Sequence, residues 1–76
     1  MSKFIKTLAL DEATRLDVVS STVSYVGKAV VASLTSAAVW KISRITSTTA
    51  GNIIIEYVDN GNYTQVWDNR TSLNYS

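Results

Sequence analysis

The chain has 76 residues, of which 46% are hydrophobic and only 17% are charged, and it contains neither cysteine nor histidine. The lack of both residue types excludes disulfides, a zinc site built from cysteine and histidine, and histidine general-base catalysis. A net charge of +1 argues against strong attraction to DNA or anionic lipid. We therefore expect residues 1–76 to form a single β domain, stabilised by close packing or by neighbouring chains.

The N-terminal part of the chain offers no targeting segment. The apolar run after Lys6 ends at Asp11, which makes it shorter than the apolar region of about 7–15 residues in a signal peptide. The most hydrophobic stretch, residues 23–40, is interrupted by Lys28 and by several hydroxyl side chains. We accordingly predict no signal peptide, no transmembrane segment and no membrane partner.

The first predicted strand is "KFIKTLAL", residues 3–10, in which Phe4 and Leu8 alternate with Ile5 and Ala9. The following "DEATRL" is expected to form a short turn capped by Asp11.

A second strand is predicted for "TVSYVGKAVV", residues 22–31. Its alternation places four side chains on one side, namely Val23, Tyr25, Ala29 and Val31. Gly27 interrupts this pattern and indicates a bulge or a close approach of backbone. The next segment, residues 32–37, is either a loop or one helical turn.

The third strand is "AVWKISRITS", residues 38–47, which alternates clearly. Trp40, Ile42 and the stem of Arg44 share one side, and Lys41 and Ser43 share the other. A turn is expected within residues 48–52, where Gly51 supplies the turn chemistry.

The last two predicted strands, "NIIIEYV" and "YTQVW", flank an Asn60-Gly61 pair that is typical of a two-residue hairpin turn. This turn would pair Val58 with Tyr63 and, at the far end, Ile54 with Trp67. One face of the hairpin would then carry Ile53, Ile55, Tyr57 and Val66, and the other Ile54, Val58, Tyr63 and Trp67. Neither face is polar, so both are expected to be covered. The predicted fold is all-β: an antiparallel meander of about five strands, closing as a barrel or a two-layer sandwich.

The C-terminal stretch "VWDNRTSLNYS" allows two interpretations. In one, Trp67 completes the aromatic face of the hairpin, Asp68 and Arg70 form a local pair, and Leu73 and Tyr75 anchor a tail. In the other, this region is a docking surface for another subunit, because Trp, Tyr and Arg dominate interface energetics. The candidate interface residues are Trp40, Arg44, Tyr63, Trp67, Arg70, Leu73 and Tyr75.

The sequence shows no motif typical of a catalytic or metal-binding site. Its serines have no histidine partner, its few carboxylates form no recognisable catalytic pair, and "DNGN" lacks the spacing of a calcium loop. We expect no enzymatic activity, catalytic residue, metal, cofactor or small-molecule substrate. A small barrel that stacks nucleic-acid bases on Trp40 beside Lys41 and Arg44, or on Trp67 beside Arg70, is the alternative from another class, although the charge balance argues against nucleic acid.

Three stretches, "YVGKA", "AVWKISRI" and "VWDNRTSLNYS", are similar to stretches in small proteins encoded among the virion genes of tailed bacteriophages, particularly phages of marine bacteria. The shared features are GKA, WxIxRI and WDNR, within about residues 25–76. The resemblance implies a virion protein, assembled in the host cytoplasm, whose partners are other virion proteins in multiple copies or a homo-oligomer. We expect an adaptor or attachment protein of the tail or its fibres, with a capsid decoration (cement) protein as the alternative.

Overall fold

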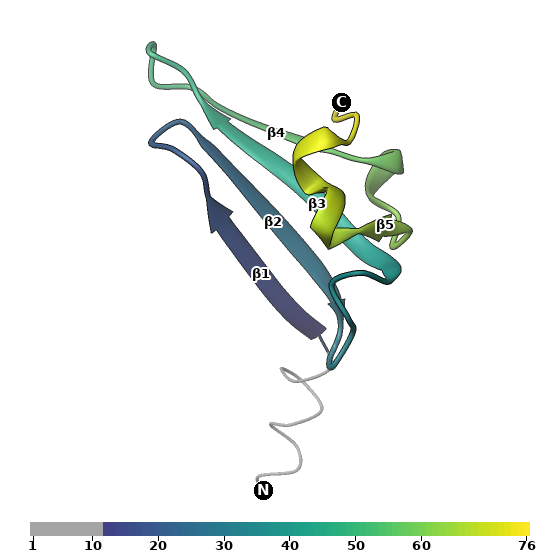
Figure 1. The fold of residues 1–76 in the computed structure, drawn as a ribbon. Coiled ribbons are helices and arrows are strands. Elements are labelled where there is room, and N and C mark those ends of the chain that lie inside the picture. Colours follow the sequence, from purple (N-terminus) through teal and green to yellow (C-terminus); the bar gives the residue numbers. More distant parts are fainter. Residues whose placement is uncertain (1–11) are drawn as a thin grey trace, which may run out of the picture.

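The computed structural model describes residues 12–76, which form an antiparallel sheet with a short helical layer on one face (Figure 1). The strands are β1 (Glu12–Val18), β2 (Val23–Val30), β3 (Ala38–Ser47), β4 (Ile53–Tyr57) and β5 (Gln65–Val66), and the 3-10 helices are η1 (Asp59–Gly61) and η2 (Trp67–Ser72). The order in the sheet is β1-β2-β3-β4, and β5 pairs with the beginning of β3.

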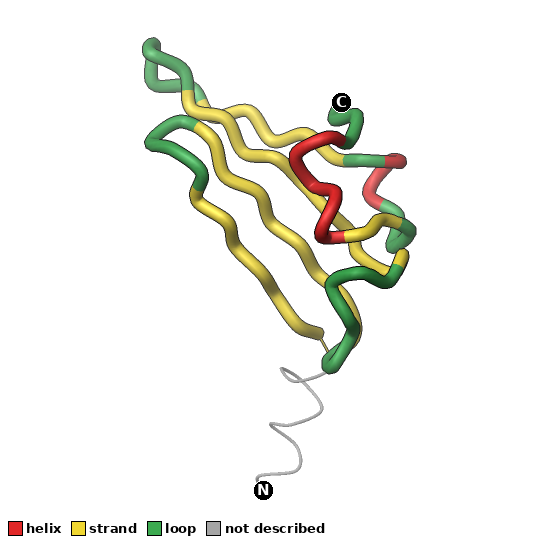
Figure 2. Tube along the Cα trace, viewed as in Figure 1, coloured by secondary structure: helices red, strands yellow, loops and turns green. Residues whose placement is uncertain are grey.

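The all-β prediction is confirmed, but the sheet is not closed as a barrel. β1 and β4 lie at opposite edges, with β2 and β3 between them. Figure 2 shows the strands as one layer with η2 in front of it. The second layer over this face is built by η2 and the C-terminal tail, because aromatic side chains from that segment supply the apolar surface that a second sheet would otherwise provide.

The two strands at the centre of the sheet confirm the sequence prediction most closely. β3 begins and ends where the alternation placed it, and β2 lies within the predicted residues. Ile42 is buried on the side that the pattern assigned to it, and Lys41 lies on the other. The connection after β2 is a loop in which Ala32 has a φ of 72°, and the turn after β3 contains Gly51 at a φ of 86°.

Neither prediction for the N-terminal part of the chain is confirmed. The predicted strand at residues 3–10 lies outside the described residues. The turn expected after Asp11 is wrong, because this stretch forms β1, in which Leu16 pairs with Val26 of β2. The turn comes later: the Ser20 hydroxyl accepts hydrogen bonds from the backbone N–H groups of Thr22 and Val23, both at 3.2 Å. This local bonding closes the β1–β2 hairpin.

The predicted hairpin around Asn60-Gly61 is also wrong. β4 and β5 both pair with β3 instead of with each other. Three successive residues, Asp59, Asn60 and Gly61, have positive φ and form η1, while the N–H of Val58 donates to Ile42 O at 3.2 Å. The chain therefore follows β3 through the turn, and packing of Trp67 into the core overrides the local preference of the Asn-Gly pair for a two-residue turn.

The core lies between the sheet and η2. Its buried members are Tyr25, Ala29, Trp40, Ile42 and Trp67. The indole rings of the two tryptophans are tilted by 40° with centroids 5.9 Å apart. Gly27 lies beneath them, and a Cβ at this position would come within 2.4 Å of Trp67 Cε3. Gly27 thus marks a close approach, but the approaching group is the side chain of Trp67 in the C-terminal segment and not the backbone that was expected.

Candidate functional site

Both tryptophans among the seven candidate interface residues are buried. Trp40 is 1% exposed and Trp67 is 5% exposed. Trp40 Nε1 donates to Leu34 O at 2.9 Å, and the N–H of Asp68 donates to Thr35 O at 3.1 Å, so the β2–β3 loop holds the start of η2. These indole rings belong to the core of the chain and offer no surface to a partner or to a nucleic-acid base.

Arg70 also serves the chain itself. Its Nε donates to Asp17 Oδ2 at 2.8 Å, which links η2 to β1 across 53 residues of sequence. Its guanidinium carbon lies 4.7 Å from the centroid of the Trp67 ring, in a cation–π arrangement. The expected local pair of Asp68 with Arg70 is therefore wrong, because the sheet brings a more distant carboxylate to the guanidinium.

The tail is anchored by Tyr75, which is half-buried. Its hydroxyl donates to Arg70 O at 2.6 Å, and its ring lies 5.6 Å from that of Tyr25 and 4.8 Å from the Arg44 guanidinium. Burial, with a smaller contribution from Tyr25, raises the pKa of Tyr75 to about 12. Leu73 packs against the same cluster. This arrangement agrees with the interpretation in which the C-terminal residues anchor a tail.

Arg44 is bound to the neighbouring strand. Its Nη2 donates to Glu56 Oε1 at 2.7 Å, and this hydrogen bond is the main reason why the pKa of Arg44 is raised. Of the seven candidates, only Tyr63 is exposed, at 49%, and it lies beside the opposite face of the sheet. The C-terminal cluster therefore covers one face, and the surface available to a partner is the other one.

This open face is the candidate site. It is formed by the alternate residues of β1 to β4 that point away from η2, and the register places Leu16 beside Val26, and Ile45 beside Ile55. Four large apolar side chains on it are strongly exposed: Leu16 at 64%, Val18 at 64%, Ile53 at 66% and Ile55 at 54%. Together with Val26 and Ile45 they leave on the order of 500 Å² of apolar surface, as much as the largest patches of typical monomers.

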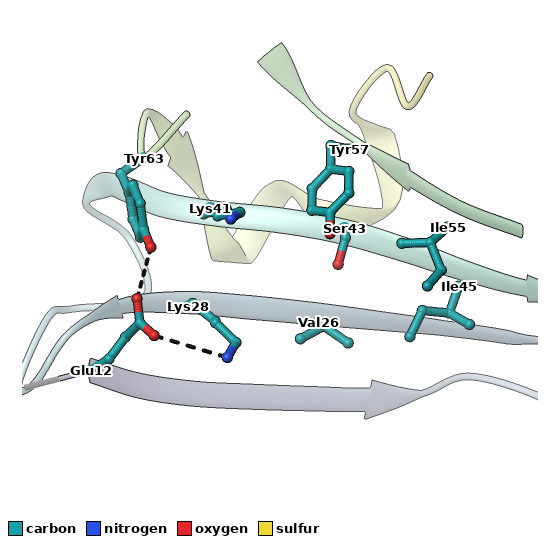
Figure 3. Close-up of a pocket in the computed structure, with 9 residues that line it drawn as sticks. All are labelled: Glu12, Val26, Lys28, Lys41, Ser43, Ile45, Ile55, Tyr57 and Tyr63. Atoms are coloured by element: carbon teal, nitrogen blue, oxygen red, sulfur yellow. Dashed lines mark hydrogen bonds and ion pairs between the residues drawn. The ribbon is translucent and has the colours of Figure 1, made fainter. Parts of the chain in front are cut away.

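A cleft of about 390 Å³ runs along the open face (Figure 3). Val26, Ile45 and Ile55 form its apolar end. Ser43, which is 8% exposed, lies between this end and a charged one. A pocket of this size suits a few side chains of a partner or a small ligand.

The charged end of the cleft contains two lysines and one carboxylate. Lys28 Nζ lies 3.9 Å from Glu12 Oε1, and the Tyr63 hydroxyl donates to Glu12 Oε2 at 2.7 Å, which raises the pKa of Tyr63. Lys41 Nζ lies 5.5 Å from the centroid of the Tyr57 ring and 5.9 Å from that of Tyr63. This end of the cleft thus attracts anionic groups and offers aromatic edges beside them.

Most of this site was missed by the sequence analysis. Glu12, Leu16 and Val18 were assigned to a turn or left without a role, and the only alternation in this stretch, Leu16-Asp17-Val18, is too short to predict a strand. Ile55 and Tyr57 were placed on one face correctly, but that face was expected to be covered.

Metal-ligating side chains do not cluster in the described part of the chain. Residues 12–76 contain no group of three or more side chains of the metal-ligating type, and no helix among them is long and apolar enough to cross a membrane. Comparison with protein-family models, with curated proteins and with solved structures finds no match for the chain. The function is therefore argued from the open face and from the sequence resemblance.

Proposed function

We propose that the chain is a non-enzymatic structural subunit of a bacteriophage virion, an adaptor or attachment protein of the tail or its fibres that binds other virion proteins through its open face. The observation that carries the binding role is the apolar patch around Ile55, which faces solvent although the core of the chain is complete without it. Exposed apolar patches of this size mark interaction sites. The virion as the place of action comes from the resemblance of the sequence.

The distribution of polar groups supports a binding role. Asp17 and Glu56, the carboxylates of the covered face, are engaged by Arg70 and Arg44 in ion pairs that hold the sheet and the tail together. The arginines that stand beside aromatic rings are thus structural. A protein that works by packing needs a folded scaffold with an exposed apolar face, and the core and the open face of residues 12–76 support this role.

The test is incorporation into particles. Particles of the phage whose genome encodes the chain would be purified on a density gradient and analysed by quantitative mass spectrometry, with immunogold labelling to locate the chain on the tail or the capsid. We expect a fixed number of copies per particle. A chain that is produced during infection but absent from purified particles would overturn the proposal, and label confined to the capsid would favour the decoration alternative.

A matched pair of variants connects the test to the open face. Ile55→Lys places a charge in the apolar patch, whereas Ile54→Lys places it on the neighbouring residue of the same strand, which points to the other side and is 45% exposed. We expect Ile55→Lys to reduce incorporation strongly and Ile54→Lys to leave it nearly unchanged. Equal incorporation of both variants would show that the open face is not the contact.

A further inference from the structure

We propose that the cleft of the open face binds an extended segment of a partner protein, which places an acidic side chain between Lys28 and Lys41 and apolar side chains over Val26, Ile45 and Ile55. This inference rests on the proposed function in that the partner is a protein of the same particle. It adds the chemistry by which that partner is recognised.

The charge of the cleft favours an acidic partner. Lys28 and Lys41 stand directly opposite each other in the β2–β3 register, and like charges in such cross-strand positions repel. Glu12 compensates Lys28 alone, at 3.9 Å, and it also accepts the Tyr63 hydroxyl. Within residues 12–76, Lys41 has no carboxylate partner and faces the rings of two tyrosines. A carboxylate supplied by a partner would satisfy both lysines at once.

The spacing of the cleft residues along β3 fits an extended segment. Lys41 and Ile45 are four residues apart on β3 and point to the same side, which separates them by roughly 13 Å. An extended segment repeats its side chains on one face with the same period. An acidic residue and a large apolar residue four positions apart, in either order, therefore match the two ends of the cleft, and Ser43 lies opposite the residue between them.

A second copy of the chain fits the face less well. Glu12, Asp17 and Glu56 are already engaged in ion pairs, so among residues 12–76 a copy has only Asp59 and Asp68 to offer to Lys41. If two copies met through the apolar end alone, each would bury on the order of 500 Å², whereas stable interfaces bury about 800 Å² per partner. A different protein that brings its own acidic group is limited neither by the free carboxylates of this chain nor by the area of its apolar end.

A nucleic acid meets a different obstacle. The apolar end of the cleft, formed by Val26, Ile45 and Ile55, is aliphatic and offers no stacking surface to a base. The exposed rings of Tyr57 and Tyr63 are close to Lys41, so a single-stranded oligonucleotide is included in the experiment as a competing outcome.

The experiment is selection from a random linear peptide library on the immobilised full chain, followed by affinity measurements with the enriched peptides. We expect the enriched sequences to share an acidic residue and a large apolar residue four positions apart, in either order. Lys41→Gln should weaken their binding about tenfold, as expected for loss of one charged hydrogen bond. Arg15→Gln, which removes the same charge from the opposite side of β1, should leave the affinity unchanged within about twofold.

A second matched pair of variants tests the apolar end of the cleft. Ile55→Thr should weaken binding of the enriched peptides about fivefold, and Ile54→Thr should not, since it alters the neighbouring residue on the other face. Circular dichroism of each variant would show that the fold is retained. Binding that is insensitive to both Lys41→Gln and Ile55→Thr would overturn the inference, as would enrichment without the acidic residue or the absence of any enrichment.

Two further outcomes would also overturn it. One is fluorescence anisotropy showing that a single-stranded oligothymidine binds more tightly than the enriched peptides. The other is sedimentation equilibrium showing a dimer that Ile55→Thr dissociates, which would make a second copy the occupant. Incorporation into particles tests the proposed function separately. If the chain is present in particles but shows no peptide preference, the proposed function stands and only this inference is wrong. If the chain binds the expected peptides but is absent from particles, this binding mode of the cleft stands and the virion role is wrong.

Discussion

The two faces of the same sheet carry similar apolar residues, but one face is buried and the other is exposed. On β2, Tyr25 and Ala29 face η2 and are buried, whereas Val30, one residue further along, is 70% exposed on the other side. Both faces carry β-branched and aromatic residues at alternate positions. The difference shows that apolar content does not by itself identify the core of a small β protein, because a layer must also be available to cover it.

The shape of the sheet surface around Gly27 decides which face the C-terminal segment covers. Gly27 leaves the space in which the Trp67 ring lies, and Trp40 supplies the ring against which it packs. At the neighbouring position, Val26 projects into the cleft of the open face. The last ten residues of the chain are thus directed to one face by a missing side chain and an aromatic partner, and the other face remains available.

The largest expected effect tests whether the covered face alone carries the fold. Trp67→Ala should lower the free energy of unfolding by about 3–5 kcal/mol, which is most of the stability of a domain of this size. Ile55→Ala on the open face should change it by less than about 0.5 kcal/mol. Urea unfolding followed by circular dichroism measures both. Similar losses for the two variants would mean that the open face is packed in the free chain.

The next effect concerns the space above Gly27. Gly27→Ala places a Cβ 2.4 Å from Trp67 Cε3 and 3.1 Å from Trp40 Cε3, so the indole rings must move. We expect a loss of about 2–3 kcal/mol, as is typical of overpacked cores. The control is Val30→Ala on the same strand, which is strongly exposed and should be nearly neutral. Unchanged near-ultraviolet circular dichroism of Gly27→Ala would contradict the close packing of the two rings.

A smaller effect is expected for the link between η2 and β1. The Arg70–Asp17 pair is about one quarter to one third exposed, so a double-mutant cycle with Arg70→Gln and Asp17→Asn should give a coupling energy of about 1 kcal/mol. The coupling should decrease with added salt. A coupling near zero would show that the cation–π contact with Trp67, not the ion pair, positions Arg70.

The smallest effect is a pH dependence. The pKa of Tyr75 is raised to about 12 in the folded chain, above its ordinary value of about 10. Stability from this group is fully present below pH 10 and is lost as pH rises from about 10 to 12, because only the unfolded chain releases the proton there. Tyr75→Phe should flatten the decline in urea midpoint over this range. A wild-type midpoint that stays constant up to pH 12 would contradict a protected Tyr75 hydroxyl.

The central strands were predictable because their alternation is strong and long. In "AVWKISRITS" the period of two places Trp40 and Ile42 on a common side, opposite Lys41 and Ser43. The unusual position of Gly27 was also visible, although its partner was not. Of the site, Lys41, Ser43, Ile55 and Tyr57 were assigned to faces correctly, yet nothing in their order indicated that these faces would stay open.

The local sequence by itself determined that this chain forms antiparallel strands, where the two longest of them lie, and which side chains share a face, because the period of two in side-chain direction is a property of the extended backbone. Only the tertiary structure decided the rest. Packing of Trp67 over Gly27 separated β5 from β4, made one face the core and brought Asp17 to Arg70. Such contacts join residues far apart in the sequence, and their energy exceeds the preference of a single turn.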